Sequence, residues 1–482
     1  MKFRLLSFLA FFVALTSCFD KASDDGDSAF FGGEIINPKG ENVILYNRKG
    51  DVADTLLLDA QNRFSHTIKN INAGLYSFRH GGEIQFVILE PKDSVMIRLN
   101  TYDFDESLVF TGKGAKKNNY LIKTFLNNEN ESQKLVKYSQ QKDPEEFDAF
   151  IKVRHNQELE NFRRFKEKAN ISDYATSIIK ANIDYHNYAD KEIYPFAYYG
   201  ENKLVHIKDL PENFYDFRNN VAYNASELSE IFAYSRFLFF HFDNIAVTDF
   251  YKNNEFHSKF NRYELSYNKS KLALVDSLVK DKTIKNNLLK YKTREFINNS
   301  KSQDEINDMM ASYLSKTTSE EDIKYMNKLI ASLDNLKPGK GLPDLKLIDI
   351  NNNEATIADI VDKPTLMYFW SANTKTHYKN SHYRVKELQA KFPKMGFMSI
   401  NINDNPEKFW KETIKQYNFN LDNEYRFENP KEALETLAVY DLYKVIIVDK
   451  DANIIHPKAN IFSKDFDRVM ENLIIRKELV LK

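Results

Sequence analysis

The chain has 482 residues, of which 42% are hydrophobic and 28% are charged, the composition of an ordinary globular protein. Its formal net charge is -1 and its pI is about 6.8, which excludes the strongly basic surface of a nucleic-acid-binding protein and a polybasic membrane patch. It holds one cysteine, Cys18, so no disulfide can form within the chain.

The first 17 residues have the pattern of an export signal. Lys2 and Arg4 form a short positive region, and residues 5–15 are almost entirely apolar. Residues 15–18 then read Leu-Thr-Ser-Cys, which resembles the bacterial lipobox, where the cysteine thiol receives a diacylglycerol. We therefore expect residues 1–17 to be a lipoprotein signal peptide and Cys18 to be the lipid attachment site. The alternative is an ordinary signal peptide with a cysteine that occurs there by chance.

The expected tether, residues 18–28, is short and acidic. Low hydrophobicity and concentrated charge predict a flexible segment. An acidic stretch directly after a lipidated cysteine also resembles the signal that sends some lipoproteins of Bacteroidota-type bacteria to the cell surface. A solvated linker without a routing role is the alternative. The acidic residues are Asp20, Asp24, Asp25 and Asp27.

Residues 29–115 carry short apolar runs separated by turn signals, and they predict an all-β domain. The turns contain glycine or proline, for example at residues 38–40 and 81–82. Strands that recur every ~8–12 residues with such turns indicate a β-sandwich or a small barrel. The expected strands are residues 30–36, 42–46, 54–58, 63–68, 75–79, 83–89, 94–99 and 108–111.

Residues 116–336 change to the periodicity of amphipathic helices and form the expected α-helical middle. Residues 143–146 (Asp-Pro-Glu-Glu) and 226–229 (Ser-Glu-Leu-Ser) have the pattern of helix starts. Residues 237–250 are strongly apolar and aromatic, which predicts a buried helix. Many of the 37 Phe and 27 Tyr lie in this middle part, where we expect them to build helix cores; a ligand platform is the alternative. Lysine-rich amphipathic stretches follow at residues 272–278, 288–297 and 323–333.

The segment 338–343, Pro-Gly-Lys-Gly-Leu-Pro, ends the helical pattern, because neither proline nor glycine continues a helix. Beyond it, strands and helices alternate, which predicts a C-terminal α/β domain of residues 337–482. Three domains also agree with the length, at roughly 150 residues per domain. The expected strands are residues 365–370, 397–402 and 445–449, and the expected helices are residues 381–392 and 406–416.

Five segments of residues 337–482 match a known family in order. They are 339–345 (Gly-Lys-Gly-Leu-Pro-Asp-Leu), 347–360 (a strand, a turn and a short helix), 363–372 (Lys-Pro-Thr-Leu-Met-Tyr-Phe-Trp-Ser-Ala), 401–404 followed by Trp410, and 447–451 (Ile-Val-Asp-Lys-Asp). They resemble the TlpA/ResA-like thioredoxins of the redoxin superfamily, which are thiol–disulfide oxidoreductases of bacterial envelopes. Residues 59–64, 76–78, 86–92, 111–115 and 118–121 form a second recognisable series. Through them the expected β-sandwich looks like the domain that precedes thioredoxin-like domains in many Bacteroidota lipoproteins. The resemblance implies a thioredoxin fold for the C-terminal third.

The active-site segment departs from the family. Where the family reads Trp-Cys-x-x-Cys, residues 373–377 read Asn-Thr-Lys-Thr-His, so Thr374 and His377 occupy the two cysteine positions. A threonine hydroxyl has no accessible anion near neutral pH and cannot form a disulfide. Tyr443 occupies the position of the family's cis-proline, and because a cis bond before a non-proline costs ~2.5–4 kcal/mol, we expect a trans, reshaped loop. We therefore expect no thiol redox chemistry and no catalytic residue.

Other chemistry finds little support in the sequence. Thr374 and His377 as a nucleophile pair would lack a carboxylate in their segment to orient the histidine. His377 and His382 would lie ~140° apart on a helix, which makes a poor metal pair. The glycines of residues 112–114 lack the remainder of a phosphate loop, and residues 403–405 lack the spacing of a calcium loop. We expect no metal and no cofactor.

We therefore expect a non-catalytic binding or scaffold protein, or an accessory subunit of an outer-membrane complex. It would be anchored to the outer membrane of the cell envelope through Cys18, on the periplasmic face or the cell surface. A thioredoxin groove suits extended peptides, so a protein or peptide is the expected partner, and nucleic acid is not. The alternative, implied by the fold alone, is a thiol–disulfide oxidoreductase of the envelope.

Overall fold

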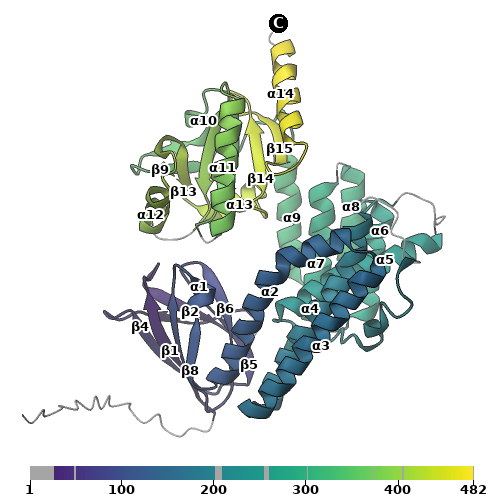
Figure 1. Ribbon diagram of the computed structural model, residues 1–482. Coiled ribbons are helices and arrows are strands. Elements are labelled where there is room, and N and C mark those ends of the chain that lie inside the picture. Colours follow the sequence, from purple (N-terminus) through teal and green to yellow (C-terminus); the bar gives the residue numbers. More distant parts are fainter. Residues whose placement is uncertain are drawn as a thin grey trace, which may run out of the picture.

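The computed structural model describes residues 27–47, 50–200, 209–253, 260–300, 302–372, 374–403 and 407–480. They form the three parts expected: two β-sheets, a helical middle, and a mixed α/β sheet (Figure 1). The expected signal peptide, Cys18 and all of the tether except residues 27 and 28 lie outside the described residues. Within those ranges, no helix combines the length and the apolar character that crossing a membrane requires.

All eight expected strands form, and they build two four-stranded sheets of order β4-β1-β7-β8 and β3-β2-β5-β6. The apolar residues of both sheets face a common core, in which Phe31 and Phe78 pack with ring centroids 5.6 Å apart. A short helix that the sequence analysis did not expect, α1 (Phe104–Ser107), follows β7. The strands are β1 (Ala29–Ile36), β2 (Asn42–Tyr46), β3 (Val52–Leu57), β4 (Arg63–Ile68), β5 (Gly74–His80), β6 (Glu83–Leu89), β7 (Ser94–Asn100) and β8 (Val109–Lys113).

Helix α2 (Ala115–Gln141) joins the sandwich to the helical middle, and two asparagines fasten its start to both sheets. The Asn118 side chain accepts the backbone N–H of Ile88 (2.7 Å) and donates to the carbonyl of the same residue (3.0 Å). Asn119 makes the same pair of bonds to Phe110, at 3.0 and 2.8 Å. Because Ile88 belongs to β6 and Phe110 to β8, these bonds fix the direction in which the chain leaves the sandwich.

The first expected helix start is confirmed and the second is wrong. The Asp143 side chain accepts the N–H of Glu146 and caps α3. Residues 226–229 instead form a short 3-10 turn, closed by the Ser229 hydroxyl on the Ser226 carbonyl, and α5 begins only at Phe232. The helices are α3 (Pro144–Ala169), α4 (Asp173–Tyr199), α5 (Phe232–Asn253), α6 (Leu265–Leu278), α7 (Lys282–Asn299), α8 (Gln303–Leu314) and α9 (Glu320–Asn335).

A buried charge cluster joins three helices of the middle part. Asp243 of α5 pairs with Lys271 of α6 at 2.9 Å and with Lys292 of α7 at 2.7 Å. All three residues are at most 4% exposed. Burial would raise the pKa of Asp243, but the two lysines outweigh it and lower that pKa to about 2. The carboxylate therefore stays charged across the physiological range.

The C-terminal part has the thioredoxin fold. Its sheet has the order β10-β9-β13-β12-β11-β14-β15, with β11 parallel to β12 and antiparallel to β14. A βαβ unit (β11-α11-β12) and a ββα unit (β14-β15-α14) thus share one sheet. The strands are β9 (Lys346–Asp349), β10 (Glu354–Thr356), β11 (Thr365–Trp370), β12 (Gly396–Asn401), β13 (Glu424–Phe427), β14 (Lys444–Val448) and β15 (Ile454–Asn460). The helices are α10 (Ile357–Ile360), α11 (Lys375–Lys391), α12 (Glu407–Tyr417), α13 (Pro430–Thr436) and α14 (Phe466–Val480).

The thioredoxin-like sheet and the helical middle share one apolar core, in contrast to domains joined only by a linker. Helix α9 packs against α13, where Tyr325 and Tyr440 lie with ring centroids 5.8 Å apart. The breaker segment 338–343 is itself held to the β14–β15 hairpin, because Gly339 donates to Ile454 (2.8 Å) and Leu342 donates to Ala452 (2.9 Å). The domain limits expected from the sequence concern segments that would fold on their own, and they remain predictions.

Candidate binding cleft

The segment between β11 and α11 forms the floor of a cleft. Thr374 occupies the position before the first helical residue, and its hydroxyl donates to the Ser371 carbonyl at 3.0 Å, so it does not cap the helix. The Asn403 side chain holds the preceding residues, since it accepts the Ala372 N–H (2.6 Å) and donates to the Ser371 hydroxyl (2.9 Å). The floor is thus fixed by polar contacts that require no thiol.

His377 and Tyr443 meet at one end of this floor. Their rings lie edge to face with centroids 5.2 Å apart, and Phe462 packs against Tyr443 at 5.7 Å. The peptide bond before Tyr443 is trans, as are all others in the described ranges. Thr374, His377 and Tyr443 all line one cleft. Tyr443 is 48% exposed and presents its ring to this cleft.

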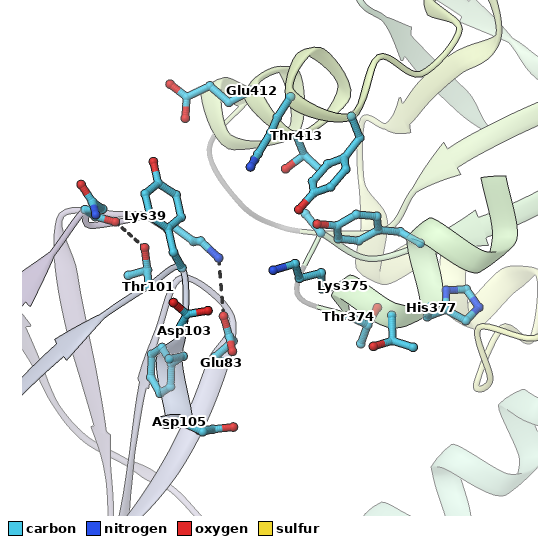
Figure 2. Close-up of a pocket in the computed structure, with 18 of the residues that line it drawn as sticks. Lys39, Glu83, Thr101, Asp103, Asp105, Thr374, Lys375, His377, Glu412 and Thr413 are labelled. Carbon is cyan, nitrogen blue, oxygen red and sulfur yellow. Dashed lines mark hydrogen bonds and ion pairs between the residues drawn. The ribbon is translucent and has the colours of Figure 1, made fainter. Parts of the chain in front are cut away.

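The opposite wall of the cleft comes from the β-sandwich (Figure 2). The cleft has a volume of about 1240 Å³. Lys39 forms an ion pair with Glu83 at 3.5 Å on the sandwich side, and Lys375 points from the start of α11 toward that wall. Six carboxylates line the described part of the cleft, against two lysines, so its surface is acidic. The carboxylates are Glu83, Asp103, Asp105, Glu106, Glu129 and Glu412.

Burial shifts the pKa values of several side chains that line the cleft. Partial burial raises the pKa values of Glu83, Asp105 and Glu129 above their ordinary range, with Lys39 opposing the shift at Glu83. Burial also lowers the pKa of His377, against the backbone of Leu442 and the charge of Asp441, which raise it. His377 is therefore mostly neutral at pH 7, where it presents an uncharged ring to a ligand.

In the described part of the cleft, Thr374 and His377 both make hydrogen bonds within the thioredoxin-like part. The Thr374 hydroxyl is engaged with a backbone carbonyl, and His377 makes its hydrogen bond to the Ser381 hydroxyl at 3.3 Å. Within the described ranges, no ion pair joins His377 to a carboxylate, and its ring interacts instead with the Ser381 hydroxyl and the Leu442 backbone. The same ranges hold no group of three histidine, cysteine, aspartate or glutamate side chains arranged for a metal.

His382, the second histidine considered as a metal ligand, has a structural role in the core. Its Nε2 lies 2.9 Å from a Glu424 carboxylate oxygen, and its Nδ1 lies 2.7 Å from the Tyr378 carbonyl. The ring stacks on Phe419 with centroids 3.6 Å apart. These contacts occupy both ring nitrogens inside the thioredoxin-like part.

The acidic wall, formed by Glu83, Asp103, Asp105, Glu106 and Glu129, is the part of the cleft that the sequence did not predict. Residues 102–106 (Tyr-Asp-Phe-Asp-Glu) carry three of its carboxylates on and beside α1. The dense acidic run was visible in the sequence, but nothing there indicated which distant segment it would face. The cleft exists because α2 and the shared core hold the sandwich beside the start of α11 (Figure 1).

No family model and no curated protein matches this chain. Solved structures match its C-terminal part. One is the thioredoxin domain of a thiol-disulfide oxidoreductase from Bacteroides vulgatus, which shares 21% sequence identity with this chain. The match covers 28% of this chain and 97% of that domain, with a TM-score of 0.25. A thiol:disulfide interchange protein from a Bacteroides species shares 22% identity over 29% of this chain and 90% of its own, also with a TM-score of 0.25. The thioredoxin fold of the last third rests on the strand order described above, and this chain has no cysteine within it.

Proposed function

We propose that this chain is a lipid-anchored envelope protein whose thioredoxin-like part binds a protein or peptide without thiol chemistry. The cleft is the observation that carries the proposal, because Thr374, His377 and Tyr443 line it opposite an acidic wall from another part of the chain. A groove of this volume, lined by aromatic and charged side chains, has room for an extended segment of a partner. The thiol chemistry in the names of the similar structures is not carried over, because this chain has no cysteine pair.

Two exposed tyrosines of the thioredoxin-like part allow a matched test of the cleft. Tyr443 lines it and is 48% exposed, whereas Tyr383 on α11 is 68% exposed and lies outside it. Each is replaced in turn by the photo-crosslinker p-benzoyl-phenylalanine, and intact cells are irradiated. We expect a discrete adduct from position 443 and little or none from position 383, which mass spectrometry then identifies. Equal or stronger crosslinking from position 383 would exclude the cleft as the binding site.

The anchor in this proposal rests on Cys18, which lies outside the described residues. In Cys18→Ala we expect near-complete loss of the protein from the membrane fraction, because no other lipid attachment site is expected. Labelling with a fatty-acid analogue should disappear together with membrane retention. Ser17→Ala keeps the small residue before the cysteine and serves as the control that should remain anchored. An unlabelled Cys18→Ala protein that stays on membranes would disprove the anchor.

An accessory subunit of an outer-membrane complex is the narrower form of the same proposal. The acidic tether at residues 18–28 supports a location on the cell surface, and protease treatment of intact cells tests it. Digestion in intact cells is expected for a surface location, whereas protection until lysis would assign the protein to the periplasm.

A further inference from the structure

A second cavity lies where the helical middle meets the thioredoxin-like sheet. It has a volume of about 450 Å³ and is separate from the cleft, although Tyr443 borders both. Its described walls come from α5, α7, α9 and from the residues around β14 and β15. Three cationic side chains converge on it from these elements: Arg294, Lys444 and Lys458.

Lys444 is the most buried of the three. It is 6% exposed, and its ammonium donates to the carbonyls of Leu437 (2.6 Å) and Ala438 (3.2 Å). Within the residues described, no carboxylate forms an ion pair with it. An ammonium has three donors, so one remains after these two bonds. A buried cation without a counter-charge is costly, and a bound anion would remove that cost.

The other two cations are also held without an ion pair in the described part of the chain. Lys458 donates to the Asn298 carbonyl (3.0 Å) and to the Asn299 side chain (3.3 Å). The Arg294 guanidinium lies over the Tyr291 ring, 4.7 Å from its centroid, and its Nη1 lies 3.5 Å from the Tyr325 hydroxyl. Neutral partners therefore position both groups.

Two carboxylates border the same cavity, and neither cancels this charge at close range. Glu295 is already paired with Arg262 at 3.0 Å and lies 3.9 Å from Lys292. Asp441 accepts the backbone N–H of Tyr443 at 2.9 Å and acts on Lys458 only from beyond ion-pair distance. Burial lowers the pKa of Lys444 to about 7, with Lys458 adding to the effect, and burial lowers the pKa of Lys458 as well. The cavity therefore holds the permanent charge of Arg294, while the charges of Lys444 and Lys458 depend on pH and would be favoured by a bound anion.

We propose that this cavity binds a small oxyanion, a phosphate or carboxylate group, held by Arg294, Lys444 and Lys458. A tetrahedral or planar oxyanion accepts several donors at once, and charge-assisted bonds of this kind are stronger than neutral ones. The site joins α7 to β14 and β15, so an anion in it would bridge the helical middle and the thioredoxin-like sheet. This inference does not depend on the function proposed for the cleft.

The test uses a soluble form of the chain that begins at Phe19, which keeps every described residue. It is titrated by calorimetry with inorganic phosphate and, separately, with succinate, at constant ionic strength set by sodium chloride. We expect saturable one-to-one binding of at least one of the two anions. Lys444→Met and Arg294→Gln should each weaken it at least tenfold, and Lys394→Met, which removes an exposed lysine in a turn, should leave it unchanged.

A second measurement needs no variant and therefore does not depend on whether the variants fold. The pH titration of the Lys444 side chain is followed by nuclear magnetic resonance with and without the anion. A bound anion favours the ammonium form, so the midpoint should move to higher pH by one unit or more, and Lys394 should not respond. Absence of saturable binding by both anions, or an unchanged Lys444 profile at saturating anion, would overturn the proposal.

Discussion

A soluble form of the chain that begins after Cys18 is expected to show no thiol–disulfide exchange. It should not reduce insulin, bind thiol reagents or form mixed disulfides with cysteine-containing peptides. The reason is compositional, since the one cysteine of the chain lies before this form begins. Disulfide exchange needs a thiolate to attack and a second thiol to resolve the mixed disulfide, and no side chain of this form supplies either. Any thiol-dependent turnover by the unmodified protein would contradict this account.

Restoring the cysteines tests whether the cleft is a former redox site. Thr374→Cys with His377→Cys should give weak insulin reduction, because Tyr443 still occupies the loop that faces the pair. Adding Tyr443→Pro should raise the activity further. The control is Thr376→Cys with Lys379→Cys, which has the same spacing on exposed positions of α11 and should remain inactive. Equal activity of the two pairs would mean that Thr374 and His377 do not occupy the family's cysteine positions.

The largest loss of stability is expected from Asp243→Asn in the helical middle. The substitution leaves Lys271 and Lys292 buried without their shared counter-charge, and breaking a buried pair in this way costs about 3–5 kcal/mol. Urea unfolding followed by circular dichroism measures the change. Asp276→Asn is the control, because Asp276 is paired with Lys285 but its side chain is 41% exposed, and such pairs contribute about 0–1 kcal/mol. Similar losses in both variants would show that the buried cluster does not stabilise the middle part.

The same cluster predicts how stability depends on pH. The pKa of Asp243 is about 2 in the folded protein, below its ordinary value of 3.8. As the pH falls, the unfolded chain takes up the Asp243 proton at a higher pH than the folded protein does. The contribution of Asp243 to the free energy of unfolding is therefore complete above pH 4 and is lost as the pH falls toward 2. Burial lowers the pKa of Lys292 to about 8, although the charge of Asp243 opposes this shift. The folded protein therefore loses the Lys292 proton before the unfolded chain does, so the contribution of Lys292 to the free energy of unfolding increases as the pH rises from 8 to 10.5. The Asp243→Asn protein should lack the acid limb of this profile.

Elements with local signals were predicted well. The strand at residues 42–46 was placed correctly at both ends, because glycine-containing turns flank it and its side chains alternate in burial. Helix α11 was expected to start at residue 381 but starts at Lys375. Its first turns are polar and bury only Tyr378, so they carry no apolar periodicity to recognise. The helix starts where it does because the chain turns back onto the sheet after β11, and this depends on the tertiary structure.

Features that depend on distant segments could not be predicted from the sequence. Lys271 and Lys292 lie in or beside stretches recognised as lysine-rich and amphipathic, whose charges usually face solvent. Both are buried because Asp243 of another helix neutralises them. The acidic wall of the cleft is a similar case, since its partner surface comes from a different part of the chain. Thr374, His377 and Tyr443 were found from the sequence only through the family resemblance.

Capture through position 443 after all thiols have been blocked tests the central claim most directly. Cells carrying p-benzoyl-phenylalanine at Tyr443 are treated with a membrane-permeant alkylating reagent before irradiation, and a second sample is irradiated untreated. If the partner binds in the cleft without thiol chemistry, both samples should give the same adduct in the same yield. That adduct should also resist reduction. An adduct that disappears after alkylation would mean that the partner is bound through thiols, which would contradict the account.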